Sequence, residues 1–93
     1  MSNFEQWSHW FERGLDVSRN KTHALAMMAW IAAHASSDGT GFAFDNAVWD
    51  SLEDEVGLAG TDAQQALVEL ISAGLVAEVS RESDDQLVAR AVL

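Results

Sequence analysis

Apolar side chains first recur with the period of an α-helix near the start of the chain. The positions are Phe4, Trp7 and Phe11. This i, i+3, i+7 spacing predicts an amphipathic helix with one apolar face. Ser2 is followed three residues later by Glu5, a capping box that predicts Ser2 as the N-cap. Gly14 is predicted to end the helix.

The next stretch, 22–35, is the most apolar part of the chain. Leu25, Met28 and Ala32 form one stripe along it. Further apolar residues fill much of the remaining circumference: Ala24, Met27, Trp30 and Ile31. A helix that is apolar on most faces is usually buried, so we expect this one to be the central core helix.

A loop, a short strand and a third helix are predicted to follow. Residues 36–41 have the Ser, Asp, Gly and Thr composition of a loop, and the alternation over 42–44 suits a very short strand. Asp45 is the predicted N-cap of the helix. The apolar positions of that helix are Val48, Leu52 and Val56. Gly57 is predicted to end it, with Leu58 packing back onto it.

The remainder of the chain is predicted to form a fourth helix and a β-hairpin. Thr61 and Gln64 form a second capping box, and Gly74 is predicted to end the helix. Its apolar face consists of Ala63, Ala66, Leu67, Leu70 and Ile71. The hairpin is predicted over 75–93, with the polar residues 81–85 as the turn between its strands. One side of its second strand carries Leu87, Ala89, Ala91 and Leu93.

This order of elements resembles that of winged helix-turn-helix domains. The run 24–35, followed by Asp38 and Gly39, is similar to the first helix and Asp-Gly turn of such domains in phage and plasmid replication or regulatory proteins. The segment 66–76 matches the AL-x-x-L-x-x-x-GLV end of winged-helix recognition helices. The resemblance implies a mainly α fold with a small β-wing, built from four helices plus a C-terminal β-hairpin.

The length and the resemblance together predict one domain over 1–93. Within it, residues 1–21 are a Trp-rich N-terminal helix and its connection. Residues 22–93, which the resemblance covers, are the winged-helix-like core.

The acidic charge of the chain is unevenly distributed. The 93 residues carry 15 Asp and Glu but 5 Lys and Arg, a formal net charge of −10. Residues 1–22 hold three acids and three bases, whereas 23–93 hold twelve acids against Arg81 and Arg90 alone. A surface of this sign repels phosphate backbones and attracts basic surfaces.

The charge pattern departs from that of DNA-binding winged helices, whose recognition helices present cationic and polar side chains to phosphates and bases. Here 58–74 contains no Lys or Arg. Gln64 and Gln65 are the side chains suited to adenine recognition. The expected acidic face consists of Asp50, Glu53, Asp54, Asp62, Glu69, Glu82, Asp84 and Asp85. Direct DNA binding is therefore disfavoured.

The predicted scaffold thus resembles that of a DNA-binding protein, whereas its negative charge resembles that of DNA itself. We predict a non-enzymatic protein-binding module whose carboxylates replace phosphates in the basic groove of a nucleic-acid-binding protein. In size and charge it is similar to phage-encoded inhibitors of host defence, including anti-CRISPR proteins. One alternative is a DNA-binding winged-helix regulator of transcription or replication. Another is that the acidity serves solubility or adaptation to high salt.

Three tryptophans are candidate partner anchors, because aromatic side chains often dominate interface energetics. Trp7 and Trp10 lie on the first predicted helix, close to Phe4 and Phe11, and a small domain cannot easily bury all four. Trp49 lies on the acidic third helix. Each tryptophan has the hydrophobic core as its alternative location. A homodimer through the N-terminal helix is also compatible with this pattern.

No motif indicates an enzyme, a metal site or a cofactor. The G-x-S-x-G, P-loop and H-E-x-x-H patterns are absent, and His9, His23 and His34 are dispersed. Zero cysteine excludes disulfides and thiolate zinc sites. No apolar run reaches the roughly 18 residues of a membrane span, and no basic leader indicates secretion. We therefore expect a cytoplasmic protein without cofactors.

Overall fold

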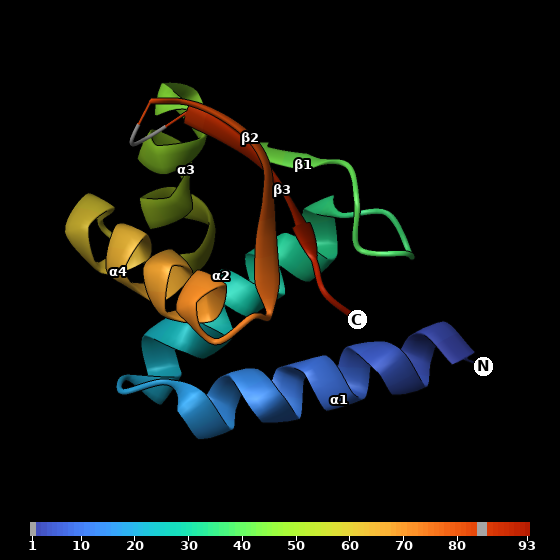
Figure 1. Ribbon diagram of the computed structural model, residues 1–93. Helices are drawn as coiled ribbons and strands as arrows, with labels where there is room; N and C mark the ends of the chain where they lie inside the picture. The colour runs from blue at the N-terminus through green and yellow to red at the C-terminus, as the bar shows by residue number, and fades with distance from the viewer. Residues whose placement is uncertain (1, 84–85) are drawn as a thin grey trace.

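The computed structural model describes residues 2–83 and 86–93, which form a mainly helical arrangement with a small antiparallel sheet (Figure 1). The helices are α1 (Ser2–Val17), α2 (Lys21–His34), α3 (Asn46–Val56) and α4 (Gly60–Ser72). The strands are β1 (Phe42–Phe44), β2 (Val76–Ser83) and β3 (Gln86–Ala91). The predicted mainly α fold with a C-terminal hairpin is confirmed at this level.

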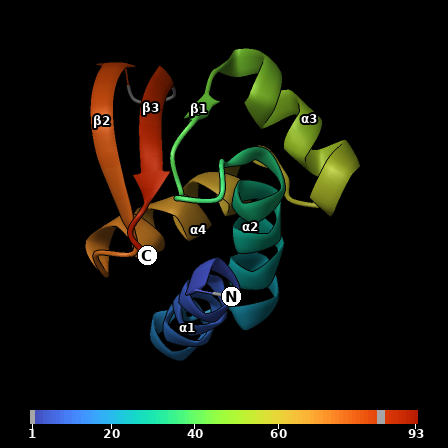
Figure 2. The same cartoon turned by 90° about the vertical axis from the view of Figure 1, so that its right-hand side faces the viewer.

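The most apolar helix, α2, lies in the hydrophobic core, as its composition predicts. Its buried side chains are Ala24, Met27, Met28, Trp30 and Ile31. It contacts α1, α3 and α4 (Figure 2). The predicted stripe is wrong at Leu25, which is 48% exposed because it projects away from the buried positions. Within the described residues, no helix is long and apolar enough to cross a membrane.

The first helix continues past Gly14 to Val17, so the prediction that Gly14 ends it is wrong. Gly14 is buried against α2, where a Cβ atom would overlap the sulfur of Met28. Glycine is therefore required for the close approach of two helices and not for a left-handed turn. The helix begins at Ser2, but the side chain expected to form the capping box lies outside the part that the structure describes.

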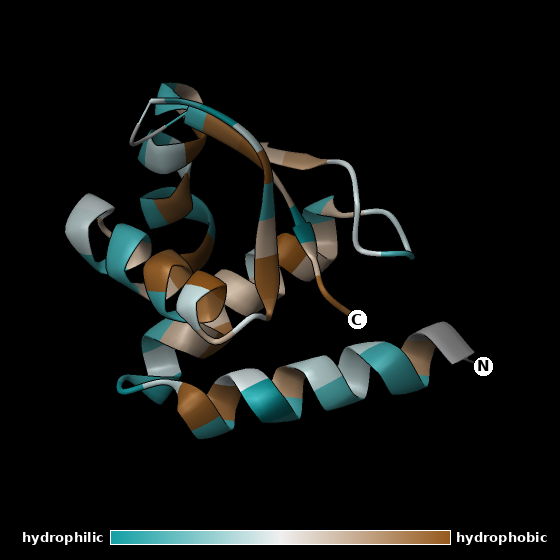
Figure 3. Ribbon diagram, in the orientation of Figure 1, coloured by the Kyte–Doolittle hydropathy of each residue, from teal (hydrophilic) through white to brown (hydrophobic). Residues whose placement is uncertain are grey.

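The core-facing side of α1 is fixed by Trp10. This side chain is completely buried, and its indole N–H donates a 2.7 Å hydrogen bond to the backbone oxygen of Leu75. Trp7 and Phe11 pack beside it, as predicted, but Phe4 is 74% exposed. Phe4 lies in the first turn of α1, whose N-terminal end extends beyond its neighbours (Figure 1). Its exposure agrees with the expectation that the domain does not bury all four aromatic side chains of this helix. Hydrophilic and hydrophobic residues are interspersed along α1 (Figure 3).

Both ends of α3 are formed as the sequence predicts. The Asp45 carboxylate accepts a 2.9 Å hydrogen bond from the backbone N–H of Val48, which satisfies a free donor of the first turn. Gly57 ends the helix in the left-handed conformation, with φ of 75°. Leu58 then returns to the core, where it is buried.

The fourth helix begins earlier than its predicted capping box. Ala59 occupies the N-cap position, and no side chain caps the helix. Thr61 consequently lies in the first turn, and the prediction of a box between Thr61 and Gln64 is wrong. Leu58 is already buried in the core, and α4 begins only two residues later, at Gly60. The predicted end at Gly74 is confirmed by its φ of 78°.

The sheet has β3 at its centre, with β1 and β2 antiparallel on either side. Alternate side chains of β1 and β3 are buried: Phe42, Phe44, Leu87, Ala89 and Ala91. The hairpin is confirmed, but β2 extends to Ser83, beyond its predicted end at Ser80. Register shifts between Glu78 and Ser80 and between Arg81 and Ser83 allow β2 to keep pairing with β3.

Replacing Gly14 with alanine tests the close approach of α1 and α2. Alanine inside a helix is normally favoured over glycine by about 1 kcal/mol, but here its methyl group would meet the buried Met28 side chain. We expect Gly14→Ala to lower the free energy of unfolding by about 1–2 kcal/mol in urea denaturation. Gly60→Ala is the matched control, because nothing lies within 4 Å of a Cβ atom there. Equal stabilisation by both substitutions would contradict the packing described.

Candidate binding surface

Three carboxylates of α3 project into solvent from one side of the helix. Asp50, Glu53 and Asp54 are exposed, and their i, i+3, i+4 spacing makes them neighbours. The buried side chains of Trp49 and Leu52 hold the helix beneath them. In the described ranges, no cationic side chain lies within ion-pair distance of these three carboxylates. Their charge is directed outward without local compensation. We call these three residues the α3 acidic row.

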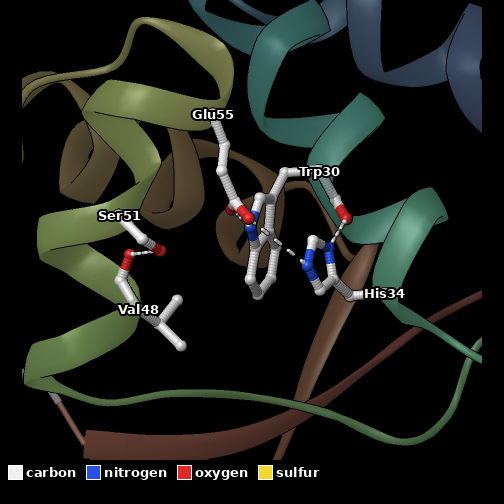
Figure 4. A network of polar contacts seen from close by, with 5 residues as sticks. All are labelled: Trp30, His34, Val48, Ser51 and Glu55. Carbon is white, nitrogen blue, oxygen red and sulfur yellow. Dashed lines mark hydrogen bonds and ion pairs between the residues drawn. The ribbon is translucent and has the colours of Figure 1, made fainter.

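A fourth carboxylate of α3, Glu55, has a structural role that the sequence analysis missed. Its Oε2 atom accepts a 2.7 Å hydrogen bond from the indole N–H of Trp30. The His34 ring stacks on Trp30 with centroids 4.2 Å apart, and its Nε2 atom lies 4.0 Å from Oε1 of Glu55 (Figure 4). This contact ties the end of α3 to α2. Only the three-dimensional contact between α2 and α3 distinguishes Glu55 from its exposed neighbours.

The two acidic residues of α4 face the α1–α2 side of the protein. The Asp62 carboxylate lies 3.9 Å from Nε2 of His23. Glu69 accepts a 3.0 Å hydrogen bond from the backbone N–H of Arg19 and a 3.1 Å bond from the Gln65 amide. The Arg19 N–H and then the Gln65 amide lower the pKa of Glu69. The assignment of Glu69 to the acidic face stays a prediction; in the structure its carboxylate accepts hydrogen bonds within the protein.

The acidic residues of the hairpin are only partly described. Glu82 is exposed near the end of β2, whereas Asp84 and Asp85 lie outside the described residues. Glu82 and Asp45 border a surface depression of about 340 Å³ whose lining includes Ala43. The Asp45 carboxylate is already used as the cap of α3. Glu82 is thus the described hairpin residue that stays a candidate for the acidic face.

A groove lies between α4 and the hairpin, and Trp49 of α3 borders it. It has a volume of about 230 Å³. Its lining residues are Trp49, Gln64, Leu67, Val68, Ile71, Arg81 and Leu87. Arg81 lies opposite Leu87 in the hairpin register, and its guanidinium group pairs with Glu78. The groove is therefore mainly apolar, although it lies on a strongly acidic protein.

The candidate aromatic anchors are largely used inside the protein. Trp10 is wrong as an exposed anchor, because it is completely buried. Trp7 is half-buried, and its indole N–H donates a 3.1 Å hydrogen bond to the backbone oxygen of Ser37. Trp49 is 8% exposed and stacks on Phe44 with ring centroids 4.8 Å apart. Trp49 accordingly belongs to the core, and its remaining accessible part borders the groove.

The basic residues near the α1–α2 connection contact the protein's own backbone. Arg13 donates a 3.2 Å hydrogen bond to the oxygen of Val92, and Lys21 donates a 2.6 Å bond to the oxygen of Leu15. These bonds fix the C-terminal segment and the end of α1. The Arg13 guanidinium thereby links α1 to the C-terminal segment, and the Lys21 ammonium closes the end of α1.

Two further features bear on function: clusters of metal-binding side chains and similarity to known proteins. In residues 2–83 and 86–93, no group of three or more His, Asp or Glu side chains is arranged to hold a metal ion. Comparison of the chain with protein-family models, curated proteins and solved structures finds no match.

The pKa of Glu69 leads to a pH-dependent stability. Because the folded state favours the ionised carboxylate, the stabilisation is present above the unfolded pKa of about 4.3 and is lost as the pH falls through the lower folded pKa. We expect Glu69→Gln to lower the free energy of unfolding by about 0.5–1 kcal/mol at neutral pH. Denaturation at neutral pH and at a series of pH values falling from about 4.3 should show the difference shrinking with acid.

Glu53→Gln is the matched control, because Glu53 is an exposed carboxylate of the α3 acidic row. This substitution should leave stability unchanged or raise it slightly at neutral pH, since it reduces repulsion within the row. A loss of stability that is the same for both variants, or that does not depend on pH for Glu69→Gln, would show that the Glu69 contact has been misassigned.

Proposed function

We propose that this protein is a non-enzymatic binding module that engages a basic surface of another protein through the α3 acidic row. The supporting observation is that Asp50, Glu53 and Asp54 are exposed on one side of a well-capped helix. Their partner would be the nucleic-acid-binding groove of a second protein. Occupying that groove blocks it without chemistry, which makes the protein a stoichiometric inhibitor of the phage antidefence type.

The charge density of the row supports mimicry of a nucleic acid. From Asp50 to Asp54 the helix rises about 6 Å and carries the three carboxylates of the row. That is one charge per about 2–3 Å, against one per about 1.7 Å of axis in duplex DNA. A rigid helix also presents these charges without the entropic cost of ordering a loop.

We further propose a winged helix-turn-helix scaffold for this module. Three features support the proposal: α3 and α4 are joined by a short turn, a β-hairpin follows α4, and β1 adds to that hairpin beside β3. In DNA-binding winged helices, the counterpart of α4 enters the major groove. Here α4 contains no Lys or Arg, and its first turn carries Asp62.

The alternative function is that of a DNA-binding regulator. It requires cations to contact phosphates, since these contacts supply most of the non-specific affinity. Arg13 and Lys21 donate hydrogen bonds to backbone oxygens, and Arg81 pairs with Glu78. The charge distribution therefore favours a basic protein over DNA as the partner.

Charge reversal in the row tests this proposal. Immobilised protein is used to capture partners from a lysate of the source organism, with Asp50→Lys/Asp54→Lys as the variant. We expect the variant to bind a captured partner about tenfold more weakly or worse, because two attractive contacts become repulsive. Binding of the unaltered protein should also weaken as salt is raised.

Glu12→Lys/Asp16→Lys on α1 is the matched control. The two residues are exposed and have the same i, i+4 spacing, so the reversal changes the net charge equally. The control variant should keep its affinity for the captured partner. Equal losses of affinity in both variants would show that the effect comes from the net charge of the protein and not from the α3 acidic row. A gel shift of random duplex DNA by the unaltered protein at low salt would overturn the proposal in favour of DNA binding.

A further inference from the structure

The groove between α4 and the hairpin has the size of a side-chain pocket. Its volume of about 230 Å³ is smaller than the roughly 300–1,000 Å³ of sites for drug-sized ligands. Val68, one of its lining residues, is 54% exposed. An exposed valine beside an apolar groove retains apolar surface that a partner side chain can remove from water. These dimensions fit one large aliphatic or aromatic residue.

The surroundings of the groove determine what accompanies that residue. Trp49 lines the groove, and Glu53 lies one helical turn further along the same side of α3. Glu53 of the α3 acidic row therefore lies on the side of α3 that borders the apolar pocket. A residue entering the pocket brings its chain neighbours close to this carboxylate, where Lys or Arg is favoured.

Arg81 does not reverse this preference. Its guanidinium group is paired with Glu78, and its neighbouring contact is the backbone oxygen of Ser83. The positive charge of Arg81 is thus already matched within the hairpin. Negative charge beside the groove comes from Glu53, which lies one helical turn from Trp49 on α3.

We propose that the groove binds a basic amphipathic segment of the partner protein, which inserts one large apolar side chain beside Val68 and places flanking Lys or Arg residues on the α3 acidic row. This inference rests on the proposed function and adds a specific anchor to it. The apolar contact supplies affinity that does not depend on salt, while the charges guide orientation. A nucleic acid offers no equivalent apolar side chain and carries the wrong charge.

A pair of synthetic peptides provides the probe. The two have equal length and equal lysine content, and they differ only in a central leucine or serine. Each is titrated into the full-length protein labelled with ¹⁵N, and amide resonances are followed by NMR. We expect the leucine peptide to bind about tenfold more tightly, from the burial of one aliphatic side chain. It should shift the resonances of Val68, Ile71 and Leu87, and the serine peptide should shift mainly those of α3.

Two matched variants separate the groove from general charge effects. Val68→Lys places an ammonium group at the groove, whereas Val79→Lys makes the same change on β2 at a residue that is 63% exposed and does not line the groove. Both positions are exposed, so both variants should fold. The advantage of the leucine peptide should disappear in Val68→Lys and persist in Val79→Lys.

The results that would contradict the groove assignment differ from those that would contradict the acidic-face function. If both peptides bind equally and Asp50→Lys/Asp54→Lys weakens both, the groove assignment is overturned and the acidic-face function stands. If the leucine peptide binds more tightly than the serine peptide, but Asp50→Lys/Asp54→Lys does not change its affinity, the acidic-face function is overturned. The proposed flanking contacts are then overturned with it. Failure of both peptides to bind overturns both proposals. Shifts of the groove resonances by a duplex oligonucleotide would also overturn the inference.

Discussion

The burial of α2 is the constraint on which the rest of the structure depends. Its apolar side chains occupy so much of its circumference that several elements must cover it. α1 can do so only because Gly14 admits the Met28 side chain, and Trp10 fixes the same helix to Leu75 near the hairpin. α3 and α4 contribute their own apolar faces to the same core. What remains outward on these two helices is the surface available to a partner.

This constraint divides the carboxylates into two groups. Glu55, Glu69 and Asp45 satisfy donors on Trp30, Arg19 and Val48 respectively. Such bonds hold neighbouring elements in place and leave those carboxylates less available to a partner. The α3 acidic row has no such use within the described residues, so its charge is free to act between molecules. The carboxylates that give the net charge of −10 therefore differ in their structural engagement, and the exposed row and the adjoining groove form the part that we propose for binding.

Local signals in the sequence were sufficient for much of the fold. Periodicity predicts the helices, and Asp45 and Gly57 act as helix ends because capping depends on adjacent residues alone. One local pattern fails, the capping box between Thr61 and Gln64, because α4 already begins at Gly60. The failures at Gly14 and Glu55 instead concern long-range contacts. Gly14 resembles a helix end, but its role is set by Met28 in another helix. Glu55 resembles Glu53, and only the position of Trp30 separates them. The α3 acidic row can be predicted from the spacing of its residues along one helix. The groove cannot, because it forms only where α4 and the hairpin pack side by side in the tertiary structure.

Competition with nucleic acid tests the central claim most directly. The complex of this protein with its captured partner is titrated with duplex DNA or RNA that the partner binds, and release is followed by fluorescence anisotropy. Mimicry predicts mutually exclusive binding, so the apparent Kd for this protein should rise in proportion to the nucleic-acid concentration. A stable ternary complex, with an unchanged apparent Kd at saturating nucleic acid, would contradict the account.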